Sequence, residues 1–200
     1  METIAADIRT WAWHSAPHGY NFNGLLIAHP EGNICVDPVE ASAAELEEIV
    51  RARPRRVLLT NRNHVRDANR IRERAGARVA IHPADAPYAR SQGAVIDDEL
   101  RAGERVGPLD VIPVPGKSPG EVALHWRERK ILIVGDAVIG NPPGRCAMLR
   151  EQVMDDPARL RESLRHLLEL DFDILLVGDG VSIMRDAKER LHELVATFTG

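Results

Sequence analysis

The first forty residues carry the hydrophobic and polar pattern of a small sheet. Apolar and polar residues alternate from Ile8 to His14, and the stretch from Phe22 to Ala28 is mainly apolar. A turn at Glu31 and Gly32 precedes a third short run, Asn33 to Val36. Short runs separated by turns predict an antiparallel meander at the start of the chain.

The pattern changes to a helical period after residue 40. Ser42 stands three residues before Glu45, which is the spacing of a capping box, and Leu46 and Ile49 follow at helical spacing. A helix over residues 42–52 is therefore predicted, ending before Pro54. Strands and helices then alternate: a strand at 57–59, a helix at 67–76, a strand at 78–81 and a helical turn at 84–90.

The second half repeats this change of pattern after a polar linker at residues 91–107. Three strands with antiparallel spacing are predicted at 109–114, 121–125 and 130–134, followed by a helix at 156–168, a strand at 174–177 and a helix at 184–197. This order predicts an α/β fold over residues 1–200 as one domain. Two mixed sheets would pack together with helices outside them, in four layers.

Composition places the chain among ordinary globular proteins, with 44% hydrophobic and 28% charged residues. The longest apolar stretches are far shorter than the roughly 18 residues that a membrane-spanning helix needs. An acid, Glu2, stands where a signal peptide has basic residues, so a cytoplasmic location is expected. Two cysteines, Cys35 and Cys146, are too few for a disulfide framework, so reduced thiols are expected.

The charge pattern argues against a nucleic-acid-binding protein, because the net charge is -4 and the isoelectric point is near 6.1. Ten arginines nevertheless fall between Arg51 and Arg78, against two acids, Asp67 and Glu73. This flank could attract an anion. The interpretation we favour is a solvated helix face, because nearly all cations of this chain are arginines and charge runs usually serve solubility.

Three loops that follow strands carry the candidate chemistry. The first runs from Thr60 to Asp67. The second combines the stretch Pro115-Gly116-Lys117-Ser118-Pro119-Gly120 with Gly135-Asp136. The third is Gly178-Asp179-Gly180. Polar residues among glycines and prolines, directly after strands, are typical of loops that hold a functional site.

Taken together, these loops resemble the metallo-β-lactamase superfamily over most of the chain. Members carry a strand ending in Thr-His-x-His-x-Asp-His, then Pro-Gly-His-Thr-Pro-Gly, then Gly-Asp, and a late Gly-His. This sequence has the matching pieces in order: Leu59-Thr60, Pro115-Gly116, Ser118-Pro119-Gly120, Gly135-Asp136 and Gly178. The segment from Asn33 to Pro38 is also similar to the family's strand that ends in Asp-Pro. The resemblance implies the four-layer fold of glyoxalase II-like hydrolases.

The ligand positions that the resemblance implies are mostly replaced. In the register of Thr60, the first four fall on Asn61, Asn63, Val65 and Arg66. The fifth falls on Lys117 and the last on Asp179, so that Asp136 alone is unchanged and six of seven positions differ. Lysine and arginine supply no metal ligand and repel a cation. We therefore expect that the family's dinuclear zinc site is absent and that no cofactor binds.

A lysine could take over the charge of the missing metal. An aspartate buried in a pocket shaped for two cations needs a positive partner. We predict that the Lys117 ammonium lies near Asp136, and near Asp179 in an extended version with Arg66 closing the network. This network could be catalytic, through Lys117 and Asp136, or could only hold the loops together. An alternative is a reduced metal site made by His64, Asp136 and Asp179, with Asp67 as a further donor, that binds one zinc or other divalent ion. His64 also has a plainer interpretation, a ring bonded to a backbone carbonyl.

Two functions follow. The leading hypothesis is a metal-independent pseudoenzyme that binds a small anionic metabolite, with Arg62, Arg66 and Lys117 as the leading contacts and Asn61, Asn63 and Ser118 as further ones. The competing hypothesis is a hydrolase of esters or thioesters that uses the reduced metal site. No membrane or nucleic-acid partner is expected, and a serine triad is disfavoured because Ser118 and Ser182 lie in no Gly-x-Ser-x-Gly elbow.

Overall fold

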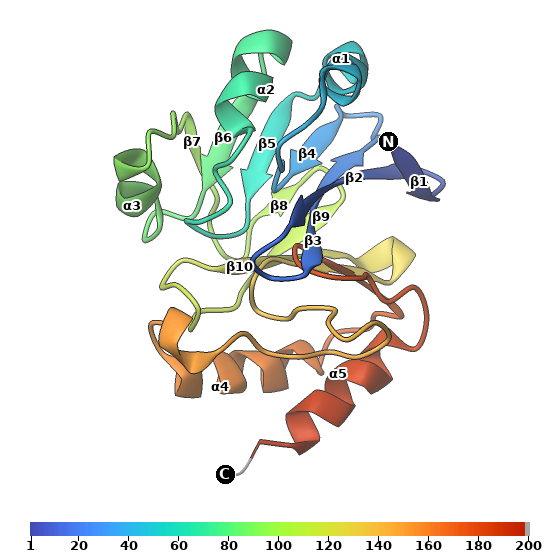
Figure 1. Ribbon diagram of the computed structural model, residues 1–200, viewed down its shortest axis with the longest axis vertical. Coiled ribbons are helices and arrows are strands. Elements are labelled where there is room, and N and C mark those ends of the chain that lie inside the picture. The colour runs from blue at the N-terminus through green and yellow to red at the C-terminus, as the bar shows by residue number, and fades with distance from the viewer. Residues whose placement is uncertain (199–200) are drawn as a thin grey trace. The chain divides into compact units, whose positions relative to one another are not determined.

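The computed structural model describes residues 1–198 and divides the chain into two compact units (Figure 1). The first unit is residues 1–101, and the second begins at Ala102. Each unit is built on its own sheet, with helices on it. Within the described residues, no helix is long and apolar enough to cross a membrane.

The N-terminal unit is a seven-stranded mixed sheet with three helices, within residues 1–101. In chain order its elements are β1 (Glu2–Ala5), β2 (Ile8–Ser15), β3 (Tyr20–Ile27), β4 (Ile34–Val36), α1 (Ala43–Ala52), β5 (Arg56–Leu59), α2 (Ala68–Ala75), β6 (Arg78–Ile81), α3 (Ala86–Ser91) and β7 (Asp98–Glu99). The strands lie side by side in this same order. Pairing is antiparallel from β1 to β4 and parallel from β4 to β7. The predicted meander is therefore confirmed.

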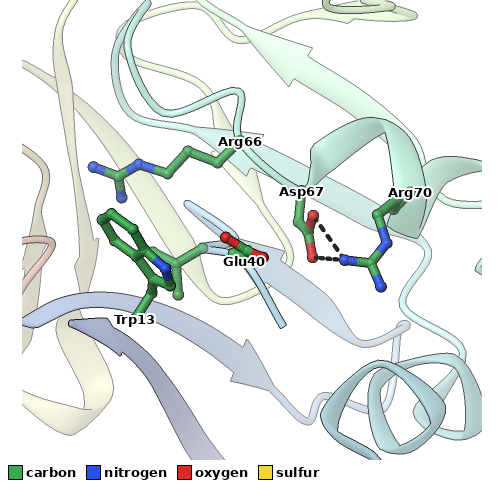
Figure 2. A pocket seen from close by; sticks show the side chains of 6 residues that line it. Trp13, Glu40, Arg66, Asp67 and Arg70 are labelled. Carbon is green, nitrogen blue, oxygen red and sulfur yellow. Dashed lines mark hydrogen bonds and ion pairs between the residues drawn. The ribbon is translucent and has the colours of Figure 1, made fainter. Parts of the chain in front are cut away.

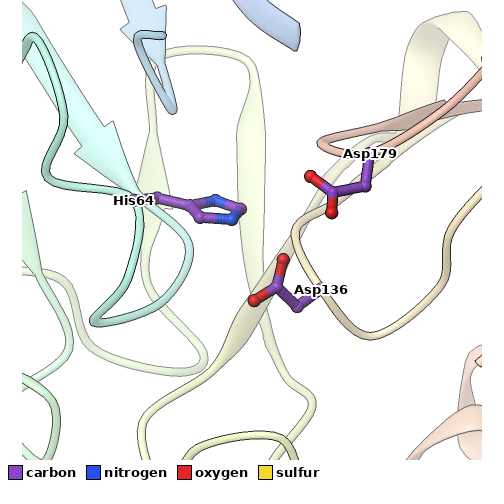
Figure 3. Close-up of side chains that lie close together, drawn as sticks. All are labelled: His64, Asp136 and Asp179. Carbon is purple, nitrogen blue, oxygen red and sulfur yellow. The ribbon is translucent and has the colours of Figure 1, made fainter. Parts of the chain in front are cut away.

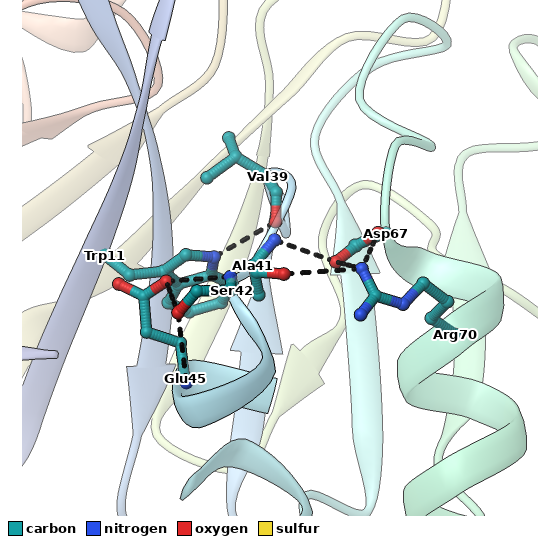
Figure 4. Close-up of polar contacts among 7 residues, drawn as sticks. All are labelled: Trp11, Val39, Ala41, Ser42, Glu45, Asp67 and Arg70. Carbon is teal, nitrogen blue, oxygen red and sulfur yellow. Dashed lines mark hydrogen bonds and ion pairs between the residues drawn. The ribbon is translucent and has the colours of Figure 1, made fainter. Parts of the chain in front are cut away.

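Local sequence explains where α1 begins and how it packs. Ser42 accepts a hydrogen bond from the Glu45 backbone N–H, and the Glu45 carboxylate accepts one from the Ser42 N–H at 2.9 Å, so the predicted capping box is present (Figure 4). Leu46 and Ile49 of this helix belong to one buried apolar cluster with Val57 and Leu59 of β5. Burial of such a stripe stabilises a helix that is too short to be stable alone.

The C-terminal unit is a five-stranded mixed sheet with two α-helices, within residues 102–198. Its elements are β8 (Arg105–Val106), β9 (Leu109–Pro113), β10 (Val122–Trp126), the 3₁₀ turn η1 (Arg127–Arg129), β11 (Ile131–Val134), the 3₁₀ turn η2 (Glu151–Val153), α4 (Pro157–Leu167), β12 (Ile174–Val177) and α5 (Ala187–Ala196). The strand order is β12-β11-β10-β9-β8. Only β11 and β12 pair in parallel; the other neighbours in this sheet are antiparallel. Leu160 and Leu164 of α4 lie in one buried cluster with Leu132 and Leu175.

Three short strands were missed by the sequence analysis. β1 is a polar strand, and it joins β2 across a two-residue connection. β7 and β8 are two residues each and fall in the stretch that was predicted to be a polar linker. A two-residue strand is too short to show an alternating pattern, and its backbone pairing comes from the neighbouring strand.

A backbone requirement explains the glycine of the Pro115-Gly116 loop. Gly116 has a φ of 144°, and a Cβ placed there would lie 2.4 Å from the backbone nitrogen of Leu160 in α4. Any side chain at this position would collide with main-chain atoms that cannot move aside. The glycine is thus needed for loop packing, whatever the neighbouring residues do chemically.

Candidate functional site

Two aspartates of the C-terminal unit follow the ends of β11 and β12 at equivalent positions. Val134 of β11 pairs with Val177 of β12 in parallel register, and Asp136 and Asp179 each stand two residues further on. Both are buried, and a carboxylate oxygen of each lies within 4.8 Å of one of the other (Figure 3). Parallel strands end at one sheet edge, so the register itself brings the two carboxylates together.

Lys117 supplies a positive charge to this pair. Its Nζ lies 2.9 Å from the Asp136 carboxylate, and both side chains are 8% exposed. The predicted ion pair is therefore present. The Glu121 carboxylate accepts a hydrogen bond from the Asp136 backbone N–H at 2.8 Å, which fixes the loop that carries the aspartate. A buried ion pair of this kind loses several kcal/mol if one partner is removed, because the other charge is left unpaired in a poorly solvated place.

The Lys117 loop is held by backbone contacts on both sides. The Ser163 hydroxyl of α4 donates to the carbonyl of Pro115 at 2.8 Å. The backbone N–H of Gly116 donates to the carbonyl of Ser118 at 3.1 Å, and that of Asp156 donates to the carbonyl of Gly116 at 2.8 Å. Ser118 itself is fully buried. Lys117 is thus presented from a fixed loop, and its ammonium has little freedom to leave Asp136.

His64 of the N-terminal unit is oriented by an acid. Its side chain is fully buried, and its Nδ1 lies 3.0 Å from the Asp37 carboxylate and 3.3 Å from the Thr60 hydroxyl. Asp37 also accepts hydrogen bonds from the Thr60 backbone N–H at 2.8 Å and from its hydroxyl at 2.6 Å. The expected bond to a backbone carbonyl is not the one made by Nδ1, whose partner is a carboxylate.

This contact decides which nitrogen of His64 is chemically useful. If Nδ1 donates its proton to Asp37, the lone pair lies on Nε2, as in histidines that bind metals with a carboxylate behind them. Asp37 and Thr60 are the functional candidates that sequence reasoning missed. The available signal was the Asp37-Pro38 pair after a predicted strand, which was used only to support the fold.

The other residues predicted in the first loop serve mainly to shape it. The Asn61 side-chain oxygen accepts from the Asn63 backbone N–H at 2.9 Å, while Asn63 itself is exposed. The Arg62 backbone N–H donates to the Asp85 carboxylate at 2.9 Å, and its guanidinium stacks over Tyr88, 4.7 Å from the ring centre. The Arg66 guanidinium stacks over Phe22, 4.5 Å from the ring centre. Contacts of these residues with a substrate stay predictions.

The arginine-rich flank is largely neutralised within the N-terminal unit. At least five of its ten arginines pair with carboxylates: Arg56 and Arg78 with Asp98, Arg70 with Asp67, Arg72 with Asp97 and Arg74 with Glu47. Most of these side chains are substantially exposed, so each pair contributes little to stability. The favoured interpretation of a solvated face fits this pattern, and a concentrated anion-binding surface does not.

Neither cysteine has the environment of a nucleophile. Both are free and buried. Burial, with a smaller contribution from the nearby Glu193 carboxylate, raises the pKa of the Cys146 thiol to about 12. Burial also raises the pKa of Cys35, with a contribution from the Asp37 carboxylate. Both side chains are therefore thiols at neutral pH, and thiol chemistry does not explain the site.

Each unit carries donor groups of the kinds that divalent metals bind. The N-terminal unit has the His64 imidazole, the C-terminal unit has the Asp136 and Asp179 carboxylates, and all three residues are buried (Figure 3). Imidazole nitrogen and carboxylate oxygen suit zinc, iron or manganese. Within the C-terminal unit, the Lys117 ammonium also lies beside Asp136.

Comparisons with known proteins found similar sequences over most of the chain. A model of the metallo-beta-lactamase superfamily matches residues 2–198. Hydroxyacylglutathione hydrolase of Anaeromyxobacter dehalogenans is 34% identical over 148 residues, which is 72% of this chain and 54% of that protein. The enzyme of the same name from Cereibacter sphaeroides is 31% identical over 70% of this chain and 51% of its own length. The chain spans about half the length of these curated relatives.

Solved structures share the fold. The structure of TTHA1623 in a di-iron-bound form is 25% identical, covers 90% of this chain and 98% of its own, and superposes with a TM-score of 0.70. A metallo-beta-lactamase from Pontibacter korlensis is 13% identical, covers 98% of each chain and has a TM-score of 0.77. The predicted fold class, α/β with two mixed sheets and helices, is confirmed.

The expectation that no cofactor binds has to be corrected. It rested on the loss of six family positions, and it gave too little weight to the residues that are kept. A similar protein has been solved with two irons bound, and this chain retains three buried residues with metal-ligand atoms. A metal ion, rather than no cofactor, is therefore the expectation for this chain.

Proposed function

The chain belongs to the metallo-beta-lactamase superfamily, and we propose that it is a metal-dependent hydrolase of esters or thioesters that works with one divalent ion. The observation that carries the proposal is the pair of buried aspartates, Asp136 and Asp179, at equivalent positions after two parallel strands. Two carboxylates so close together are costly without a cation. Lys117 brings one positive charge to this pair, and a divalent ion is a further cation that the two carboxylates could share.

The proposed ligands are His64, Asp136 and Asp179. Asp37 supports His64 by fixing the ring and by directing the lone pair to Nε2. A bound divalent ion would lower the pKa of a water molecule and polarise the substrate carbonyl. Lys117 orients Asp136 through the 2.9 Å contact, and it takes the electrostatic place of a second metal. Catalytic participation of Lys117 itself, and substrate contacts by Arg62, Arg66, Asn61, Asn63 and Ser118, remain part of the proposal.

The names of the relatives favour a thioester among the substrate classes. Hydroxyacylglutathione hydrolase is the name of the two curated relatives, and their similarity to this chain covers about half of their length. We therefore propose a small thioester as substrate. The proposal uses only the part of those proteins that this chain matches. The pseudoenzyme hypothesis was tied to the absence of a cofactor and is no longer the leading one. One domain and a cytoplasmic location stay predictions.

The test is hydrolysis of a small panel of acyl thioesters and p-nitrophenyl esters by protein loaded with zinc, manganese or iron(II). We expect turnover that is lost with a chelator and restored by the same metal. Asp136→Ala should lower the rate at least about 100-fold, since a ligand is removed. Asp171→Asn is the matched control, because this exposed aspartate of the same unit pairs with the exposed Lys130. Equal rates with and without metal would contradict the proposal.

A further inference from the structure

Glu121 is a buried acid that contacts the loop of Asp136. It is 1% exposed and comes directly before β10. β10 pairs with β11 in an antiparallel register in which Leu124 lies opposite Ile133. Continued past the ends of the two strands, this register places Glu121 opposite Asp136. The sheet thus brings these two acids together, although they are 15 positions apart in the sequence.

The side chain of Glu121 supports Asp136, while its backbone is fixed elsewhere. The Asp136 backbone N–H donates to Oε1 of Glu121 at 2.8 Å. The Glu121 carbonyl accepts from the Val114 N–H at 2.9 Å, and the Glu121 N–H donates to the Ser118 carbonyl at 3.5 Å. The backbone of Glu121 is therefore attached to the end of β9 and to the Lys117 loop. Its side chain extends this support to Asp136.

The second aspartate of the pair is fixed by main-chain groups. The Asp179 carbonyl accepts from the Gly140 N–H at 2.9 Å, and the Val181 N–H donates to the Gly140 carbonyl at 2.9 Å. A Cβ at Gly140 would lie 2.0 Å from the Val181 carbonyl oxygen, so this crossing requires a glycine. These bonds do not depend on a side chain, whereas the bond from Asp136 ends on one. A substitution of Glu121 can therefore loosen one aspartate and leave the other in place.

Glu121 is placed to act through Asp136 and not as a ligand itself. Within residues 1–198, it belongs to no group of three or more residues whose ligand atoms could hold a metal ion together. Its oxygen Oε1 faces a backbone N–H, which is a donor and no place for a cation. Groups that hold a metal ligand in place raise the metal affinity, because the ligand is oriented before the metal arrives.

We infer that Glu121 is a positioning residue, whose hydrogen bond with the Asp136 N–H raises the affinity of the chain for a divalent ion. Because Asp136 is a proposed ligand, this role of Glu121 rests on the proposed function. The hydrogen bond fixes the backbone of Asp136 and thus the start of its side chain. The acceptor oxygen is what this role needs, and the negative charge of Glu121 is not. Glutamine keeps an acceptor oxygen without the charge, so the two contributions can be separated.

The experiment measures the zinc affinity of the whole chain by calorimetry, with Glu121→Leu and Glu121→Gln as the variants. Glu121→Leu should bind zinc about 10- to 100-fold more weakly, which is the usual effect of removing the support of a metal ligand. Glu121→Gln should stay within about threefold of the unaltered chain, since it keeps the acceptor. In the metal-free chain, NMR should show slow hydrogen exchange of the Asp136 amide, unchanged in Glu121→Gln and faster in Glu121→Leu.

Two controls separate positioning from a general loss of stability. His125→Ala removes a buried ring at the other end of β10, where Nε2 contacts the Asp171 carbonyl at 2.9 Å. Arg70→Met removes the contact with Asp67 beside a pocket of the N-terminal unit (Figure 2). Both variants should melt at a lower temperature than the unaltered chain, with zinc affinities changed by less than about twofold. Thermal unfolding also shows whether each Glu121 variant is folded.

The outcomes distinguish this role of Glu121 from the proposed function. If the unaltered chain binds zinc and Glu121→Leu binds it equally well, Glu121 is no positioning residue and the proposed function stands. If Glu121→Gln is weakened more than about tenfold, the charge counts and the inference is overturned, even where Glu121→Leu is not folded. If the unaltered chain binds no zinc, manganese or iron(II), the proposed function and this inference are both overturned.

Discussion

The two units hold the polar groups of their loops in different ways. In the N-terminal unit, the loop after β5 carries a buried imidazole, His64, whose ring lies against the Asp37 carboxylate. In the C-terminal unit, the loops carry two buried carboxylates, Asp136 and Asp179, and the Lys117 ammonium lies beside Asp136. One unit thus orients an imidazole with a carboxylate, and the other supplies an internal cation to its carboxylates.

This difference teaches that a buried carboxylate can orient a neighbouring imidazole or can be held by a fixed cation. A lysine beside an aspartate supplies a positive charge of the kind that a metal ion would also supply. The number of metal ions that the chain binds is therefore the quantity that tests the proposed function. A loop residue such as Gly116 is required for packing, so it says little about which metals bind.

The largest expected effect comes from breaking the internal pair. Asp136→Asn should lower the free energy of unfolding by about 3–5 kcal/mol, since it leaves the Lys117 ammonium buried without its anion. The double variant with Lys117→Met should recover a large part of this loss. Urea unfolding measures both. Arg74→Met is the control, because it breaks an exposed ion pair and should change stability by less than about 1 kcal/mol. Equal losses of stability in the two variants would show that the buried Lys117–Asp136 pair matters no more than an exposed one.

A second change tests whether Gly116 is required for the packing of its loop against α4. Gly116→Ala should lower the free energy of unfolding by about 2–4 kcal/mol, because the added Cβ meets the Leu160 backbone and φ is 144°. Gly76→Ala is a useful control, since it also has a positive φ but has no atom near the added Cβ. Chemical denaturation of both variants should show a clearly larger loss at Gly116. Similar losses would mean that backbone strain alone matters.

A third change, in the N-terminal unit, removes the Asp37 carboxylate that contacts His64. Asp37→Asn should weaken metal affinity about 10- to 100-fold, because the ring loses the carboxylate that orients it. His64→Gln should weaken it at least as much. His82→Gln, at a histidine outside the three loops, is the control. Metal titration followed by calorimetry gives the affinities, and an unchanged affinity in Asp37→Asn would show that His64 is no ligand.

The smallest effect concerns a surface pair with a clear pH dependence. Hydrogen bonds from Arg72, and to a lesser degree from the Val79 backbone, lower the pKa of Asp97 to about 2 from its usual value of 3.8. A lowered pKa in the folded state stabilises the protein above pH 4, and this contribution is lost as the pH falls toward 2. Asp97→Asn should lower the melting temperature by no more than roughly 4 °C at pH 7 and should have no effect near pH 2. Thermal unfolding at both values checks this.

The longer elements could be predicted from local patterns, as periodicity and the Ser42–Glu45 capping box located α1. The pairing of Lys117 with Asp136 was predicted differently: the family resemblance placed both residues in one pocket, where a buried acid needs a positive partner. The contact of His64 with Asp37 was not predictable, since the two residues are 27 positions apart and meet only through the parallel pairing of β4 with β5. The cofactor was predicted wrongly because counting lost ligands ignores what the remaining ones can still hold.

The most direct test is the metal content of the untagged chain after loading with zinc, manganese or iron(II) and removal of excess metal. We predict one equivalent per chain, held in the presence of the Lys117–Asp136 pair, and a rise toward two equivalents in Lys117→His, which restores a nitrogen ligand. Elemental analysis gives both numbers. No retained metal under any loading, or two equivalents in the unaltered chain, would contradict the account.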